Sequence, residues 1–137
     1  MEKKATKKKV TVTLVNQTPA PVGEVYVFHN EWADRHGDSD TMVKVFSNKQ
    51  KAEAYLKKDI REYLEYHDAV KAVPTKTGVN KLMIDHKSVD EIDGKSLVRD
   101  RSLAAVLADA AKTGYLEINM DSSGTYSHWA VYKEDVL

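Results

Sequence analysis

The 137-residue chain contains no cysteine. Disulfides, thiolate zinc sites and cysteine nucleophiles are therefore excluded together, and the composition fits a reducing cytoplasm. No apolar run approaches the roughly 18 residues that a transmembrane helix requires. Residues 1–9 are basic but lead into residues 10–15 without a long apolar segment, so we expect no secretory signal and no membrane partner. We predict a cytoplasmic globular protein.

The formal net charge is zero, but the charge is unevenly distributed. Residues 1–9 hold one acid, Glu2, and the five lysines Lys3, Lys4, Lys7, Lys8 and Lys9. The remaining 16 basic and 20 acidic residues leave residues 10–137 mildly acidic. We predict a disordered basic tail over residues 1–9, because like charges repel one another, and one domain over residues 10–137. An acidic body repels phosphates, which argues against a nucleic-acid-binding face on the domain itself.

Strand-favouring residues predict five strands, with alternation in some and apolar side chains on both faces in residues 24–32 and 41–46. The five strands cover residues 10–15, 24–32, 41–46, 115–120 and 125–132. The polar loop 33–40 and the turn residues 121–124 make two hairpins of the last four strands. Strands and helices do not alternate strictly. The pattern therefore favours an α+β domain with a mostly antiparallel sheet, built from two hairpins plus an N-terminal strand, and with two main helices on one face.

The first main helix is predicted from a capping box of Ser47 and Gln50 to a point before Pro74. Its apolar stripe comprises Ala52, Leu56, Ile60, Tyr63, His67 and Val70. The second helix is predicted from an N-cap at Asp100 to Gly114. Between them we predict a short strand within residues 79–84, and a short helix that begins with a second capping box, Ser88 with Glu91, and ends at Gly94.

Two loops could carry chemistry, and each has a simpler explanation. The loop at residues 36–40, with His36, Asp38, Ser39 and Asp40, and with Asp34 before it, could bind calcium or magnesium. However, Val45 stands where a twelve-residue calcium loop needs an acid, and hairpin tips favour such residues for their turn geometry. Residues 93–96 end like a phosphate-binding loop, but the required earlier glycine is replaced by Val89. No hydrolase, zinc-protease or dinucleotide motif occurs, so we predict no catalytic residue, metal ligand or cofactor.

Histidines supply a further candidate for acid–base chemistry. His29 and His128 both lie in predicted strands and become neighbours if the two hairpins share one sheet. With Glu31 nearby they could form an acid–base site. Cross-strand packing is the favoured interpretation.

The aromatic residues point to binding rather than catalysis. Seven of the eleven are tyrosine and two are tryptophan, residues that combine apolar area with a polar group and suit protein interfaces. Trp32 lies at the mouth of the first hairpin. Tyr55, Asp59 and Tyr66 share one shoulder of the first helix. We predict that these four residues bind a partner protein.

Three functions are ranked on this basis. A non-catalytic protein-binding module comes first, a nucleic-acid-binding accessory protein that uses the lysine tail comes second, and a small metal-dependent hydrolase comes last.

The layout of residues 24–32, 41–47 and 125–136 around a capped helix resembles small proteins of phages and mobile elements. Some of these inhibit bacterial defence systems, including the anti-CRISPR proteins. The resemblance implies stoichiometric binding to a larger host protein.

Overall fold

We analysed a computed structural model of the chain, which describes residues 8–14, 24–96, 101–120 and 124–135. Lys3, Lys4 and Lys7 of the predicted tail lie outside the described residues. The first strand begins at Lys8, so Lys8 and Lys9 belong to it rather than to the segment before it. The predicted turn at 121–123 also lies outside the described residues.

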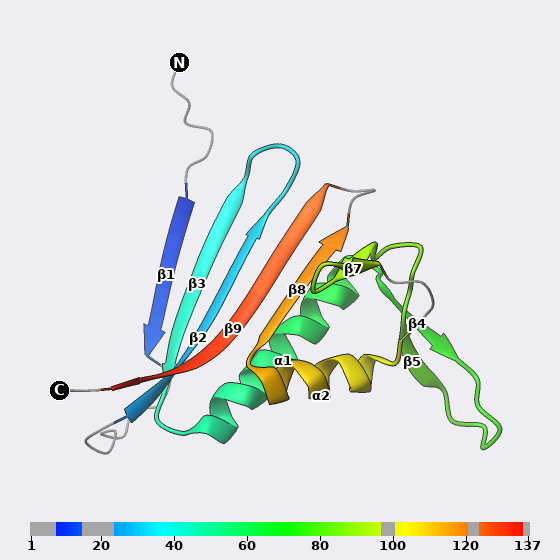
Figure 1. The fold of residues 1–137 in the computed structure, drawn as a ribbon. Coiled ribbons are helices and arrows are strands. Elements are labelled where there is room, and N and C mark those ends of the chain that lie inside the picture. Colours follow the sequence, from blue (N-terminus) through cyan, green and yellow to red (C-terminus); the bar gives the residue numbers. More distant parts are fainter. Residues whose placement is uncertain (1–7, 15–23, 97–100, 121–123, 136–137) are drawn as a thin grey trace.

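The described part of the chain forms an α+β fold, as predicted (Figure 1). In order along the chain, its elements are β1 (Lys8–Leu14), β2 (Glu24–Ala33), β3 (Ser39–Phe46), α1 (Lys49–Tyr66), β4 (Val70–Val73), β5 (Lys81–Ile84), β6 (Glu91–Ile92), β7 (Lys95–Ser96), α2 (Leu103–Thr113), β8 (Tyr115–Met120) and β9 (Thr125–Asp135). One sheet has the order β1-β3-β2-β9-β8-β6-β7, and its pairs are antiparallel except β1 with β3. β4 and β5 form a separate hairpin, which projects away from the sheet.

The two hairpins meet at the centre of the sheet, where β2 pairs with β9. Alternation gives the sheet two different faces. Trp129 of β9 lies opposite Leu116 of β8, and both are buried on the face that carries the helices. Asn30 of β2 is also buried on this face, and its amide donates to the Ser127 hydroxyl at 3.0 Å and to the His128 carbonyl at 2.9 Å. These bonds satisfy a buried polar group and help to fix the β2–β9 register.

Helix α1 begins and ends differently from the prediction. Its N-cap is Asn48, whose side chain accepts a hydrogen bond from the Lys51 amide at 2.8 Å, so the predicted Ser47–Gln50 capping box is wrong. The helix ends at Tyr66 because Asp68 adopts a left-handed backbone conformation, with φ of 53°. Val70 therefore lies in β4, where β-branched residues are favoured, and not on the helix stripe.

The segment before α2 also corrects the prediction. The expected helix over residues 88–94 is wrong, because β6 and β7 form a tight hairpin there. Asp93 and Gly94 both have positive φ, 54° and 78°, as the preferred two-residue hairpin turn requires. The strand expected within residues 79–84 is confirmed as β5. The N-cap of α2 is Ser102, which accepts from the Ala105 amide at 3.0 Å, whereas the predicted cap Asp100 lies outside the described residues.

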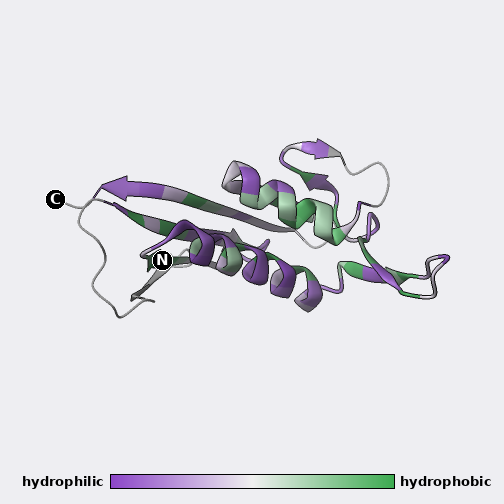
Figure 2. Cartoon of the chain, turned by 90° about the horizontal axis from the view of Figure 1, so that it is seen from below, coloured by the Kyte–Doolittle hydropathy of each residue, from purple (hydrophilic) through white to green (hydrophobic). Residues whose placement is uncertain are grey.

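One hydrophobic core lies between the sheet and the helices. Its buried side chains include Trp129 and Phe28 from the sheet, and Ala52, Leu56, Ile60 and Leu64 from α1. Figure 2 shows the difference between the helices: α2 is hydrophobic along much of its length, and α1 is mostly hydrophilic. Helix α1 therefore depends on this single narrow apolar stripe to bind the sheet.

Candidate functional site

Two of the four predicted binding residues line one concavity of about 420 Å³. They are Trp32 near the end of β2 and Tyr66, the last residue of α1; the other lining residues are Asp34, Tyr63, His67 and Thr125. Tyr66 is 84% exposed. We call this feature the aromatic concavity.

The topology explains why residues so distant in sequence meet there. β2 and β3 are antiparallel, and α1 follows β3 and runs back along the sheet towards the β2–β3 loop (Figure 1). β9 begins at the same end, because Ala33 pairs with Tyr126. The end of β2, the end of α1 and the start of β9 therefore converge.

The inner wall of the aromatic concavity is anchored in the core. The Tyr63 ring meets the buried Trp129 ring edge-on, with centroids 5.1 Å apart. His67 packs between two tyrosines, at 4.6 Å from the Tyr63 ring and 5.0 Å from the Tyr66 ring. This packing positions Tyr66 at the rim, although most of its own surface is open.

Burial changes the chemistry of two groups in this wall. It lowers the pKa of His67, which favours the neutral imidazole near neutral pH. It raises the pKa of Tyr63 well above its usual value. The Tyr63 hydroxyl is buried and has no hydrogen-bond partner among the described residues, which is an arrangement that folded proteins usually avoid.

Asp34 organises the opposite rim. Its Oδ1 accepts hydrogen bonds from the backbone amides of His36, at 2.9 Å, and Asp38, at 3.1 Å. This is the turn geometry that favours aspartate in loops. In the described parts of the chain, no group of three or more histidine, aspartate or glutamate residues is arranged to hold a metal ion.

The other two predicted binding residues make contacts within the domain. Tyr55 packs against Phe28 and Phe46, with ring centroids 4.9 and 5.7 Å away, and the Lys44 ammonium lies 4.2 Å from its ring centroid. Asp59 accepts a hydrogen bond from the Trp129 indole at 2.9 Å. At a rise of 1.5 Å per residue, Tyr55 and Tyr66 are roughly 16 Å apart along the helix axis. The structure does not bring them into one patch.

The contact between Asp59 and Trp129 leads to a stability prediction. We expect Asp59→Ala to destabilise the fold by about 1–3 kcal/mol, because the buried indole N–H loses its acceptor. Asp59→Asn keeps an acceptor and should be close to neutral. Urea unfolding of both variants, with a melting scan, measures the difference. Equal destabilisation by Ala and Asn would contradict the hydrogen bond.

The pKa of Asp59 gives this comparison a pH dependence. Burial raises the pKa above 3.8, and the Trp129 hydrogen bond opposes the shift only in part. A carboxyl with a raised folded-state pKa costs stability as the pH rises from below its unfolded-state value through its folded-state value. The asparagine of Asp59→Asn does not ionise and therefore lacks this cost. The free energy of unfolding of the variant, compared with that of the wild type at the same pH, should therefore increase from acid to neutral pH.

The open face of the sheet carries the second aromatic group. His29 and His128 are neighbours there, as expected for two hairpins in one sheet, with ring centroids 5.6 Å apart. Tyr115 stacks on His128 at 6.0 Å, and the Tyr126 hydroxyl lies 3.3 Å from His128 Nδ1. Burial and a hydrogen bond with Glu117 raise the pKa of Tyr126 to about 12. The aromatic side chains thus pack on one another across the strands.

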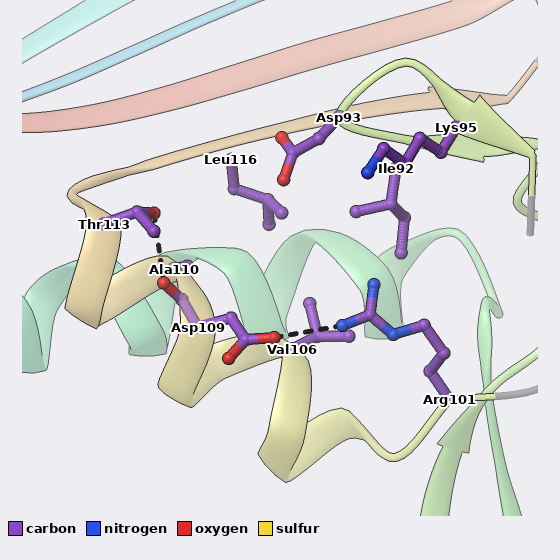
Figure 3. Close-up of a pocket in the computed structure, with 9 residues that line it drawn as sticks. All are labelled: Ile92, Asp93, Lys95, Arg101, Val106, Asp109, Ala110, Thr113 and Leu116. Atoms are coloured by element: carbon purple, nitrogen blue, oxygen red, sulfur yellow. Dashed lines mark hydrogen bonds and ion pairs between the residues drawn. The ribbon is translucent and has the colours of Figure 1, made fainter.

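A second hollow, of about 400 Å³, lies between α2 and the β6–β8 strands (Figure 3). Arg101 and Asp109 form an ion pair across it at 3.1 Å. Asp93 accepts a hydrogen bond from the Glu117 amide at 2.9 Å. Four charged side chains line this hollow, and three of them, Asp93, Arg101 and Asp109, therefore have partners within the domain. The residues that resembled a phosphate-binding loop form the β6–β7 turn at its edge.

Comparison of the chain with protein-family models, with curated proteins and with solved structures finds no match. No helix in the described ranges is long and apolar enough to cross a membrane.

The sequence predicts Trp32 and Tyr66 as binding residues but does not link them to Tyr63 and His67, which line the same concavity. The helical periodicity places Tyr63 and His67 on the apolar stripe, with no connection to Trp32. The available signal was the spacing of Tyr63, Tyr66 and His67, which puts all three rings in the last helical turn once the helix ends at Tyr66.

Proposed function

We propose that the protein is a non-catalytic protein-binding module that docks a partner protein at the aromatic concavity. The observation that carries this proposal is the 84% exposure of Tyr66 beside Trp32, on a wall fixed to the core. Tyrosine and tryptophan dominate binding energy in protein interfaces when a partner covers them. A large exposed ring on a rigid support loses little conformational entropy on binding.

Three features favour this location over the other hollow and the open face. The aromatic concavity combines an exposed ring with a buried hydroxyl that lacks a partner among the described residues. In the hollow beside α2, Arg101, Asp109 and Asp93 bond within the domain. On the open face, Tyr115 and Tyr126 hydrogen-bond to Glu117 and His128.

The partner we propose is a larger host protein, bound stoichiometrically. In the finer form of the proposal, the chain is an accessory protein of a phage or mobile element that inhibits a host defence protein. The resemblance in layout supports this form. Inhibition by stoichiometric binding requires only a stable binding surface, which a small α+β domain supplies.

A pull-down from the source cell tests the proposal. Nuclease-treated lysate separates protein partners from nucleic-acid partners. Tagged wild type, Tyr66→Ala and a triple variant with Lys3, Lys4 and Lys7 changed to alanine are compared. We expect one protein to be retained after nuclease treatment, to be retained by the lysine variant, and to be lost with Tyr66→Ala. Loss only with the lysine variant, or only after nuclease treatment, would favour the nucleic-acid function instead.

A further inference from the structure

We propose that the aromatic concavity receives a basic side chain of the partner, with the guanidinium of arginine as the preferred group. This inference rests on the proposed function and adds the chemistry of the docking contact. Three independent features favour a cation at this place: the charge of the flanking segments, the end of α1, and the aromatic rings, of which Tyr66 is exposed.

The two segments that form the aromatic concavity are both acidic. Residues 31–40 hold four acidic residues and one arginine, and residues 59–68 hold the same balance. Asp34 lines the concavity itself. In the second segment, Glu62 forms an ion pair with Lys58 at 3.6 Å and Asp59 accepts from Trp129. The other two acids, Glu65 and Asp68, are next to Tyr66 and His67 in sequence. Such a rim attracts a cationic group and repels an anionic one.

Helix α1 adds a partial negative charge, because its C-terminal end forms one wall of the concavity. The last carbonyl groups of a helix carry this charge, and lysine or arginine in the last turn usually balances it. The last turn of α1 has no basic residue. Its cap, His67, packs between Tyr63 and Tyr66, and burial lowers its pKa.

The rings supply the third attraction. A cation over the face of tryptophan or tyrosine is stabilised by the ring quadrupole, and arginine makes this contact most often. The domain already uses the same contact at Tyr55, where Lys44 lies 4.2 Å from the ring centroid. No lysine or arginine of the described residues lies over Trp32 or Tyr66. Tyr66 is 84% exposed, so its ring is accessible to a cation of the partner.

An NMR titration tests the inference without the partner. The chain has two tryptophans and therefore gives two indole N–H signals. Trp32 lines the concavity, whereas Trp129 is fully buried and bonded to Asp59, so it serves as an internal control. The probes are the N-acetyl amides of arginine, glutamine and leucine. We expect a saturable shift of the Trp32 signal with the arginine probe, in the millimolar range or weaker, and no change of Trp129.

Asp34→Asn is the matched variant for the charge. Its side-chain oxygen still accepts from the amides of His36 and Asp38, so the loop is kept while the charge is lost. We expect it to weaken the arginine probe severalfold, and Tyr66→Ala to abolish the saturable shift. Equal affinity for the arginine, glutamine and leucine probes would overturn the inference.

The outcomes also separate this inference from the proposed function. Partner binding that depends on Tyr66, with no saturable arginine shift at Trp32, would overturn the cationic contact and leave the docking site in place. Partner binding that ignores both Tyr66 and Trp32 would overturn the docking site itself.

Discussion

Leu56→Asp and Ile60→Asp should each unfold the domain or destabilise it by about 4 kcal/mol or more. Both side chains are fully buried on the α1 stripe, in the core that also holds Trp129. A carboxylate placed there loses its hydration and meets apolar side chains only. Since folded domains are stable by only about 5–15 kcal/mol, one such charge removes much of the total.

Urea unfolding measured by circular dichroism checks this expectation against Lys57→Asp. Lys57 is exposed and lies next to Leu56 in sequence, but on the other side of the helix. Its substitution should change the free energy of unfolding by about 0.5 kcal/mol or less. Equal tolerance at positions 56 and 57 would show that the helix does not bind the sheet through this stripe.

Trp32→Ala and Tyr66→Ala should each weaken partner binding by about 30-fold, or about 2 kcal/mol, which is typical of a central interface aromatic. Tyr66→Ala should leave the melting temperature unchanged, because the ring is mostly exposed in the free protein. Binding affinities by calorimetry and melting temperatures are measured together. Loss of binding would then be separable from loss of fold.

Three further substitutions serve as controls for this experiment. Tyr55→Ala should lower the melting temperature, because the ring packs against Phe28 and Phe46. His36→Ala and Asp38→Ala should keep both stability and affinity, since their side chains are exposed at the loop. Loss of function confined to these two loop variants, with a requirement for metal, would favour a metal-dependent hydrolase over the binding module.

The fold was predictable where local signals agree with the tertiary structure. The residue patterns predict β1, β2, β3, β5, β8 and β9 but not β4, β6 and β7. Gly114 ends α2 in the expected left-handed conformation, with φ of 74°. The errors lie where two local signals compete. The N-cap of α1 is Asn48 and not the predicted Ser47. At residues 88–94, the chain forms a hairpin turn at Asp93 and Gly94 instead of the helix that the capping box at Ser88 predicts. At both places a capping-box pattern predicts a helix start that the structure does not show.

The site was predictable only in part, because its contacts are long-range. The sequence singles out Trp32 and Tyr66 by residue type and position, but whether the two residues line one concavity depends on where α1 ends. The expected apolar stripe runs past Asp68 to Val70, about one turn beyond the observed end of α1 at Tyr66. The bond from Trp129 to Asp59 joins residues 70 positions apart, so no local pattern predicts that Asp59 turns inward.

Hydroxyl-radical footprinting of the complex shows most directly where the partner lies. Tyr66 is 84% exposed at the aromatic concavity, and Tyr132 is 44% exposed on the open face of the sheet, so both should be labelled in the free protein. We predict that the partner protects Tyr66 and Trp32 and leaves the labelling of Tyr132 unchanged. Protection of Tyr132 and Tyr115 with unchanged labelling of Tyr66 would contradict the docking site and place the partner on the open face.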